Sequence, residues 1–204
     1  MKKYFTALTT TALISAAPFA LAASSTDLTV KGLITPVACT PTFTGGGVID
    51  LGKISSGDLN ETSNTLVGTH PIQLVVTCDA SAKFALNPID NKASTSIGDW
   101  FGLGLTDASE QLGQFVPKVI EISDGTSTLD AIKSDDGGST WVKATDAQAG
   151  YLLSFTTAGG TAPIDATDVT FEFEVDTYIA RADSLTLTDE VKIDGSATFE
   201  VKYL

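Results

Sequence analysis

The sequence contains little histidine, cysteine, methionine or positive charge. Its 204 residues include one histidine, one methionine and two cysteines, too few for a histidine-rich metal site or a cysteine-rich scaffold. Only 12 Lys and Arg stand against 25 Asp and Glu, which gives a formal charge of −13. Because phosphate binding needs a basic patch, this composition argues against a nucleic acid as partner.

The remaining composition favours an all-β domain. Hydrophobic residues make up 43% of the chain and charged residues 18%, which is too apolar for a disordered acidic chain. The 29 threonines fit the pleated surface of a strand better than a helix, where threonine loses rotamer freedom. A chain of this length can bury one sizeable core, so we expect one domain.

The first 22 residues have the pattern of a secretory signal peptide. Lys2 and Lys3 form a positive start, a mostly apolar stretch follows, and Ala20-Leu21-Ala22 is the small-x-small pattern that signal peptidase reads. The alternative is a membrane anchor, but Pro18 interrupts the run short of the roughly 20 apolar residues that a spanning helix needs. We therefore expect an exported chain that begins at Ala23, carries a charge of −15 and has no transmembrane segment.

The only two cysteines, Cys39 and Cys78, are predicted to form a disulfide. In an oxidising compartment an isolated pair normally becomes a structural bridge. Closing a loop of about 40 residues stabilises a fold by on the order of 4 kcal/mol in the chain-entropy model. The alternatives are weaker, because a zinc site needs more ligands than two thiols and the distant His70.

Alternating apolar and polar residues predict short β-strands. The alternation is clear over Ile72–Cys78, Val169–Val175 and Lys192–Tyr203. Further strands are expected at residues 30–37, 47–54, 82–86, 101–105, 116–122, 139–143 and 151–156, and helical turns only within 107–115 and 143–150. About ten short strands separated by glycine, Asn-Pro and Asp-Gly turns favour a β-sandwich.

No motif marks a catalytic or metal site. A Ser-His-Asp relay would have to use His70, which lies between Thr69 and Pro71 and is expected to be exposed in a loop, and there is no GxSxG motif. The acidic cluster Ser134–Gly137 lacks the alternating oxygen ligands and distal glutamate of a calcium loop. We therefore predict a protein that is not an enzyme, with no catalytic residues, no metal and no cofactor.

Three segments at the two ends of the exported chain resemble chaperone–usher fimbrial subunits. Lys31–Cys39 resembles the opening strand of that family, in which a Lys-Gly step leads through an apolar strand to the first cysteine. Ile72–Cys78 is similar to the strand that carries the second cysteine, and Gly195–Leu204 to the C-terminal motif with its penultimate tyrosine.

The middle of the chain resembles a narrower group of proteins. Cys39–Asp50, Asp90–Ser94 and Phe101–Gly104 resemble a less-characterised family of fimbrial-like exported proteins in Gram-negative bacteria. Together the likenesses cover essentially all of residues 23–204. They imply an immunoglobulin-like sandwich that lacks its final strand, so that a groove is open along the C-terminal strand. In such subunits a periplasmic chaperone fills the groove, and the next subunit then replaces it by β-augmentation.

The resemblance assigns acceptor and donor residues. On the C-terminal strand Ala197, Phe199, Val201 and Tyr203 are expected to line the acceptor groove, and the carboxylate of Leu204 to anchor to basic residues of the chaperone. The alternative is an ordinary strand buried by its own chain. The domain would span 31–204, after a short extension at 23–30 whose Thr26, Leu28 and Val30 form the candidate donor face. A disordered stub is the alternative for that extension.

Three functions remain open from the sequence. The first is a structural subunit of a surface fimbria, with the chaperone, an outer-membrane usher and neighbouring subunits as partners and a role in cell adhesion. The second is a tip or capping subunit that binds a surface ligand. The third is an exported β-sandwich binding protein that does not polymerise. The expected location is the periplasm in transit and then the fimbrium at the cell surface.

Overall fold

The computed structural model describes residues 28–30, 32 and 37–204. The chain divides into two units, Met1–Ile34 and Thr35–Leu204. The described residues of the first unit are exposed and belong to no helix or strand. The predicted signal peptide, residues 1–22, and most of the strand expected at 30–37 lie outside the described residues.

The second unit is built from strands, which confirms the all-β prediction. Ten strands form one sheet: β1 (Cys39–Phe43), β2 (Thr65–Ala82), β3 (Phe84–Asp90), β4 (Phe101–Gly102), β5 (Gly113–Ser123), β6 (Thr128–Ser134), β7 (Val142–Lys143), β8 (Leu152–Thr156), β9 (Ala166–Ile179) and β10 (Ala197–Tyr203). Four short 3₁₀ turns connect them: η1 (Thr44–Gly47), η2 (Ser56–Asp58), η3 (Ala93–Thr95) and η4 (Ala182–Ser184). No α-helix occurs in the described part of the chain, and none of its helices is long and apolar enough to cross a membrane.

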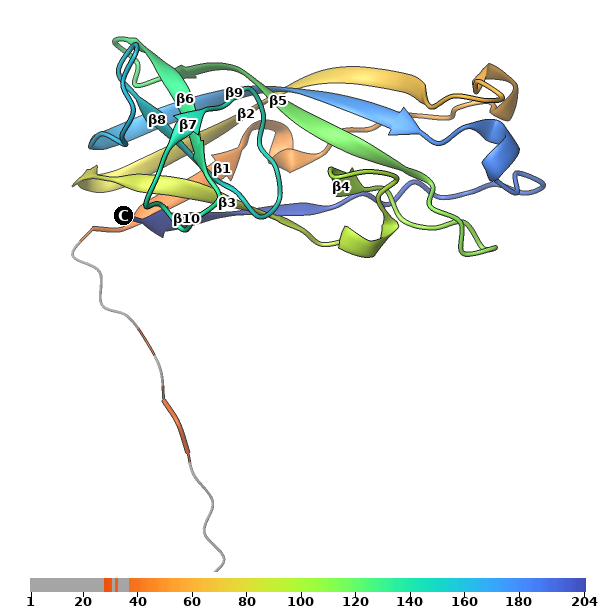
Figure 1. Ribbon diagram of the computed structural model, residues 1–204, viewed down its shortest axis with the longest axis horizontal. Helices are drawn as coiled ribbons and strands as arrows, with labels where there is room; N and C mark the ends of the chain where they lie inside the picture. The colour runs from red at the N-terminus through yellow and green to blue at the C-terminus, as the bar shows by residue number, and fades with distance from the viewer. Residues whose placement is uncertain (1–27, 31, 33–36) are drawn as a thin grey trace, which may run out of the picture. The chain divides into compact units, whose positions relative to one another are not determined.

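The sheet is nearly closed. Its strand order is β1-β2-β9-β5-β6-β8-β3-β10, with β4 added to β5 and β7 added to β6, and every pairing is antiparallel. Strand β6 joins the two halves, so that β3 and β10 lie on the opposite side of the domain from β9 and β5 (Figure 1). The first and last strands of the order, β1 and β10, do not pair with each other.

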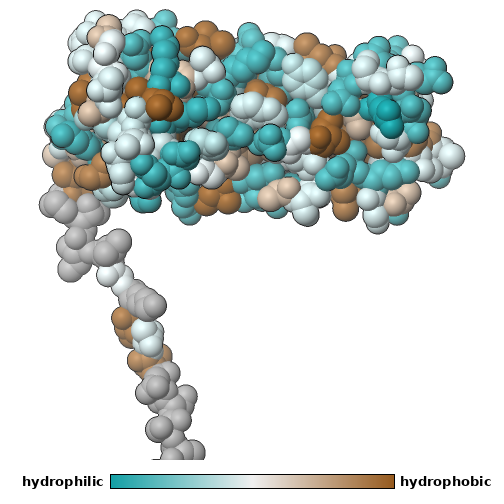
Figure 2. Space-filling model, viewed as in Figure 1, coloured by the Kyte–Doolittle hydropathy of each residue, from teal (hydrophilic) through white to brown (hydrophobic). Residues whose placement is uncertain are grey.

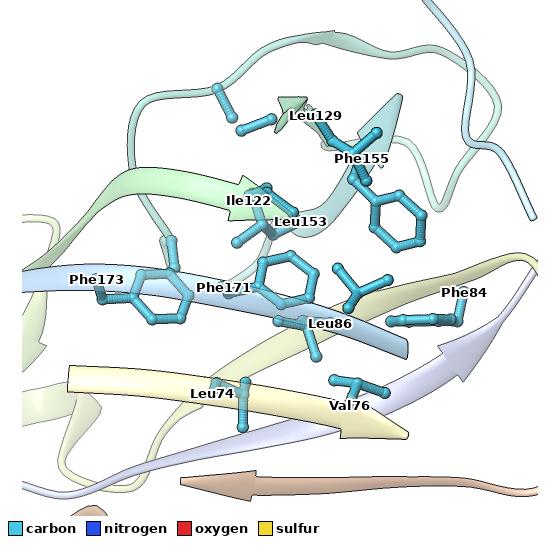
Figure 3. Close-up of a cluster of buried hydrophobic side chains, with 14 of the residues drawn as sticks. Leu74, Val76, Phe84, Leu86, Ile122, Leu129, Leu153, Phe155, Phe171 and Phe173 are labelled. Atoms are coloured by element: carbon cyan, nitrogen blue, oxygen red, sulfur yellow. The ribbon is translucent and has the colours of Figure 1, made fainter. Parts of the chain in front are cut away.

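The larger of two apolar clusters lies inside this sheet. Alternate residues of β9, including Phe171 and Phe173, point inward and meet Leu74 from β2 and Phe155 from β8 (Figure 3). The Phe84 and Phe155 rings meet edge to face, with centroids 5.1 Å apart, a favourable aromatic geometry. The predicted alternation over Val169–Val175 is therefore confirmed, because its apolar members are the buried ones.

The polar residues between them carry much of the acidity. Glu172 and Glu174 lie on the outer face of β9, where the side chain of Gln73 donates to Glu172 over 2.8 Å. The face of the molecule in Figure 2 is mostly hydrophilic, with its hydrophobic residues in small separate groups.

Several predicted elements differ from the structure. The sequence prediction missed β6, in which neighbouring residues Ala131 and Ile132 are both buried, so that simple alternation is broken. The helical turn expected within 107–115 is wrong, because the chain reverses through Ser109 at φ 64° and forms a Leu105–Gln111 bridge. No helix forms within 143–150, and of the strand expected at 139–143 only β7 is present. The segment at 47–54 is discussed below, because it joins no strand of the described sheet.

Candidate functional site

The described part of the chain has an apolar groove beside β10. Its central part has a volume of about 270 Å³ and is lined by Phe43, Gly47, Ile49, Leu51, Ile72, Leu103, Phe115, Pro117, Phe173, Val175, Thr177, Ile193, Gly195, Ser196, Ala197 and Phe199. A second part of about 520 Å³ shares Ile49, Leu51 and Ile193 with the first, so the two parts are continuous.

The floor of the groove belongs to the central strands. Phe173, Val175 and Thr177 of β9 form its middle, flanked by Ile72 of β2 and Pro117 of β5. Beyond them the second part continues over Leu59, Leu112 and Ile179. Apart from Thr177 the floor is apolar, because these are the inward positions of strands whose other face is polar. The walls of the second part are partly charged and include Lys53, Asp189 and Glu190.

The two rims are irregular segments that join no β-ladder of the described chain. On one side residues 48–54 follow η1, and on the other residues 185–196 lead from η4 into β10, the dark blue coil of Figure 1. Val48 has φ −105° and ψ 127°, and Leu185 has φ −122° and ψ 137°, both strand-like. Among the backbone groups of residues 48–54 and 187–193, only Gly52 N–H makes a hydrogen bond within the described chain, and it donates to the side chain of Asp50.

The rim that leads into β10 is held at both ends. The backbone N–H and the hydroxyl of Thr186 donate to the Glu110 carboxylate over 2.6 and 2.8 Å. The backbone hydrogen bond from Thr186 is the main reason that the pKa of Glu110 is lowered. At the other end Asp194 N–H donates to the carbonyl of Leu103 over 2.9 Å, and the Asp194 carboxylate pairs with Lys92 at 2.9 Å. The segment between Thr186 and Asp194 is therefore held in place as a preformed edge of the groove.

Side chains close one end of the groove. The backbone N–H of Cys39 in β1 donates to the hydroxyl of Tyr203 in β10 over 2.7 Å. Beside it the rings of Phe43 and Phe199 meet edge to face at 5.3 Å. Contacts of this kind hold β1 near β10 without a backbone ladder, so the open part of the groove lies beyond Phe43 and Phe199.

The predicted disulfide is present. Cys39 and Cys78 are directly opposite each other in the pairing of β1 with β2, and their sulfur atoms are bonded. The bond fixes the start of β1, the strand that carries Phe43 at the closed end of the groove. The prediction of a structural bridge is confirmed, and the described residues contain no free cysteine.

The predicted groove residues are placed as follows. Ala197 and Phe199 line the groove, and Val201 packs against the main core. Tyr203 is 39% exposed and makes the contact with Cys39, while Leu204 donates its backbone N–H to the carbonyl of Lys83 over 3.1 Å. The last two residues therefore belong to the closed end.

The predicted donor residues lie in the other unit. Thr26 is outside the described residues. Leu28 is 90% exposed and Val30 is 87% exposed. The donor role stays a prediction.

The sequence prediction missed the rim residues Ile49, Leu51 and Ile193 as groove residues. Their alternation was visible, and residues 47–54 were expected to form a strand. The structure corrects this, because only Ile49 and Leu51 face the groove as in a strand, Gly52 then turns the backbone at φ 64°, and the segment pairs with no described strand. Alternation reports which side chains are buried and does not say where the backbone hydrogen bonds go.

His70 is also different from its prediction. It lies within β2 opposite Val175, half-buried, and its Nδ1 atom is buried without a hydrogen-bond partner. The ring occupies space left by Gly68, where an added Cβ would come within 2.4 Å of His70 Cε1. His70 is therefore a packed strand residue and not an exposed loop residue.

Acidic side chains elsewhere are satisfied by neighbouring donors. Asp136 accepts hydrogen bonds from Ser134, from the backbone of Ser139 and from both the backbone and the hydroxyl of Thr140, over 2.7 to 2.9 Å. Within the described ranges no group of three or more His, Cys, Asp or Glu side chains could hold a metal ion. The absence of a metal, a cofactor and enzyme activity stays a prediction.

Comparison with known proteins assigns the chain to a family. Its sequence is 30% identical to Protein GltF of Escherichia coli strain K12 over 253 aligned positions, which cover 100% of this chain and 99% of that protein. The chain belongs to the GltF family. A second relative, the Uncharacterized protein YhcF of the same strain, is 25% identical over 91% of this chain and 94% of its own length. Residues 28–102 match the family model described as Protein of unknown function (DUF1120).

Proposed function

We propose that this member of the GltF family is a structural subunit of a chaperone–usher surface fimbria, with a part in cell adhesion. The single observation that carries the proposal is an apolar groove between two rims, residues 48–54 and 187–193, that join no backbone ladder of the described chain. In this proposal the domain is an immunoglobulin-like sandwich without its final strand, and a strand from another chain completes it.

The groove has the two properties that β-augmentation uses. Its rims at 48–54 and 187–193 offer unpaired N–H and C=O groups on both sides, so an inserted strand can form two ladders. Its floor offers apolar side chains, and burying each large apolar side chain of the inserted strand contributes roughly 1.5–3 kcal/mol. Left open, such edges favour aggregation.

The partners follow from this use of the groove. A periplasmic chaperone covers it first, an outer-membrane usher receives the complex, and a neighbouring subunit then supplies the strand. The chain is periplasmic in transit and ends at the cell surface. These steps agree with the signal-peptide pattern at residues 1–22 and with the disulfide, which needs an oxidising compartment.

Periplasmic expression of residues 1–204 alone tests the proposal. We expect the product to aggregate or to be degraded. A version that carries an alternating apolar strand on a flexible linker after Leu204 should be a stable monomer with the groove filled. A matched control has the same strand composition with the apolar residues shifted by one position, and it should not be rescued. A stable monomer from the unmodified chain would contradict the open groove.

A further inference from the structure

We propose that the groove of this chain takes a strand from a different polypeptide and not from a second copy of the chain, so that the protein does not polymerise with itself. The occupant is a segment of a different polypeptide with about four bulky apolar residues at alternate positions. The inference rests on the proposed function, since it concerns the occupant of the same groove.

The floor sets how many side chains an occupant needs. Four alternate inward positions of β9 lie along it: Phe173, Val175, Thr177 and Ile179. At about 3.3 Å per residue, these positions span roughly 20 Å. A strand that covers this length has about seven residues, of which about four point to the floor.

The rims offer the occupant backbone partners. Residues 48–54 and 187–193 join no β-ladder of the described chain, although Gly52 turns the first at φ 64° and Thr188 and Asp189 bend the second. The closed end at Tyr203 and Cys39 stops an occupant from sliding past Phe199. The site is therefore built for a strand of defined length.

The chain's own N-terminal segment does not supply that strand. Counting back from Val30, the same face carries Val30, Leu28, Thr26, Ser24, Ala22, Ala20, Pro18 and Ala16. Only Leu28 and Val30 are bulky and apolar, wherever the signal peptide is cut. The opposite face carries Asp27, and its large apolar residues Phe19 and Leu21 belong to the predicted signal peptide.

Peptide binding tests whether the N-terminal segment of the chain can fill the groove of a second copy. The chain of residues 23–204 is refolded with a peptide of residues 23–32 or with the same peptide carrying Ser24→Val and Thr26→Ile, which completes four apolar residues on one face. A control peptide carries Ser25→Val and Thr29→Ile, the same added residues on the other face. Affinity is measured by fluorescence anisotropy of labelled peptide, and folded yield by size-exclusion chromatography.

We expect the peptide with four apolar residues on one face to bind on the order of 100-fold more tightly than either other peptide, because two more large apolar side chains enter the groove. The full chain carrying Ser24→Val and Thr26→Ile should also form ladders in unboiled gels, which the natural chain should not. Equal binding of the natural peptide and the peptide with four apolar residues on one face would overturn this inference, and so would ladders from the natural chain. If none of the three peptides binds, the groove takes no strand, and the proposed function itself is wrong.

Discussion

Asp176 is the clearest case of a residue whose environment determines its effect on stability. It lies on the outer face of β9, yet its side chain is only 4% exposed, and it accepts hydrogen bonds from Lys118, Thr69 and Tyr178. Burial raises the pKa of Asp176, but the hydrogen bonds from Lys118 and Thr69 outweigh it, so the pKa lies below its ordinary value of 3.8.

Substituting Asp176→Asn should therefore lower the free energy of unfolding at pH 7 by about 1–3 kcal/mol, because buried donors lose a charged acceptor. The folded-state pKa is below the unfolded one, so this contribution is present in full above about pH 4 and is lost as the pH falls through the folded-state pKa. Urea unfolding at pH 7 and pH 3 measures it. Asp168→Asn, an exposed position on the same strand, should change neither midpoint.

A second residue-scale prediction concerns the loop at Asp136. The hydrogen bonds from the backbone and hydroxyl of Thr140 hold the pKa of Asp136 well below its usual range. Asp136→Ala removes the acceptor of the backbone N–H groups of Ser139 and Thr140, so it should speed hydrogen exchange at both amides. Mass-spectrometric exchange measures this, with exposed Asp135→Ala as the control. Unchanged exchange in Asp136→Ala would mean that the loop is ordered by its glycines alone.

At the scale of elements, the rim that leads into β10 depends on its anchor at Glu110. Glu110→Ala removes the acceptor for both donors of Thr186, so the segment up to Asp194 should open more often. Limited trypsin digestion should then cut after Lys192 several-fold faster. Glu190→Ala is the control, because its pair with Lys53 spans 3.7 Å between side chains that are 87% and 89% exposed, and such pairs contribute little. Equal cutting of both variants would show that Glu110 does not hold the rim.

Elements also show what the sequence could and could not predict. Strands such as β9 were predicted because one face meets a core supplied by the same chain, and alternation records that burial. The β6 strand was missed because the fold buries Ala131 and Ile132 together. The groove was predicted only in part: Ala197 and Phe199 followed from a resemblance, while Ile49, Leu51 and Ile193 needed the long-range topology that places residues 48–54 opposite residues 187–193.

At the scale of the whole molecule, the disulfide acts mainly on the unfolded chain. It joins residues 39 positions apart and restricts the denatured ensemble. In the chain-entropy model the double substitution Cys39→Ser and Cys78→Ser should lower the free energy of unfolding by about 4 kcal/mol. Urea unfolding measures the loss, and reduction of the natural protein by dithiothreitol should give a similar value. If neither the double substitution nor reduction lowers the free energy of unfolding, the disulfide lies outside the part of the chain that unfolds cooperatively.

The pairing of β2 with β9 affects the folding rate of the domain as well as its shape. It runs from Thr65 opposite Ile179 to Ala82 opposite Ala166, and about 100 residues of chain separate its partners, which slows folding. Until β9 docks, the inward apolar face of β2 is exposed, so the slow closure of this pairing sets how long the unfinished fold is open to aggregation.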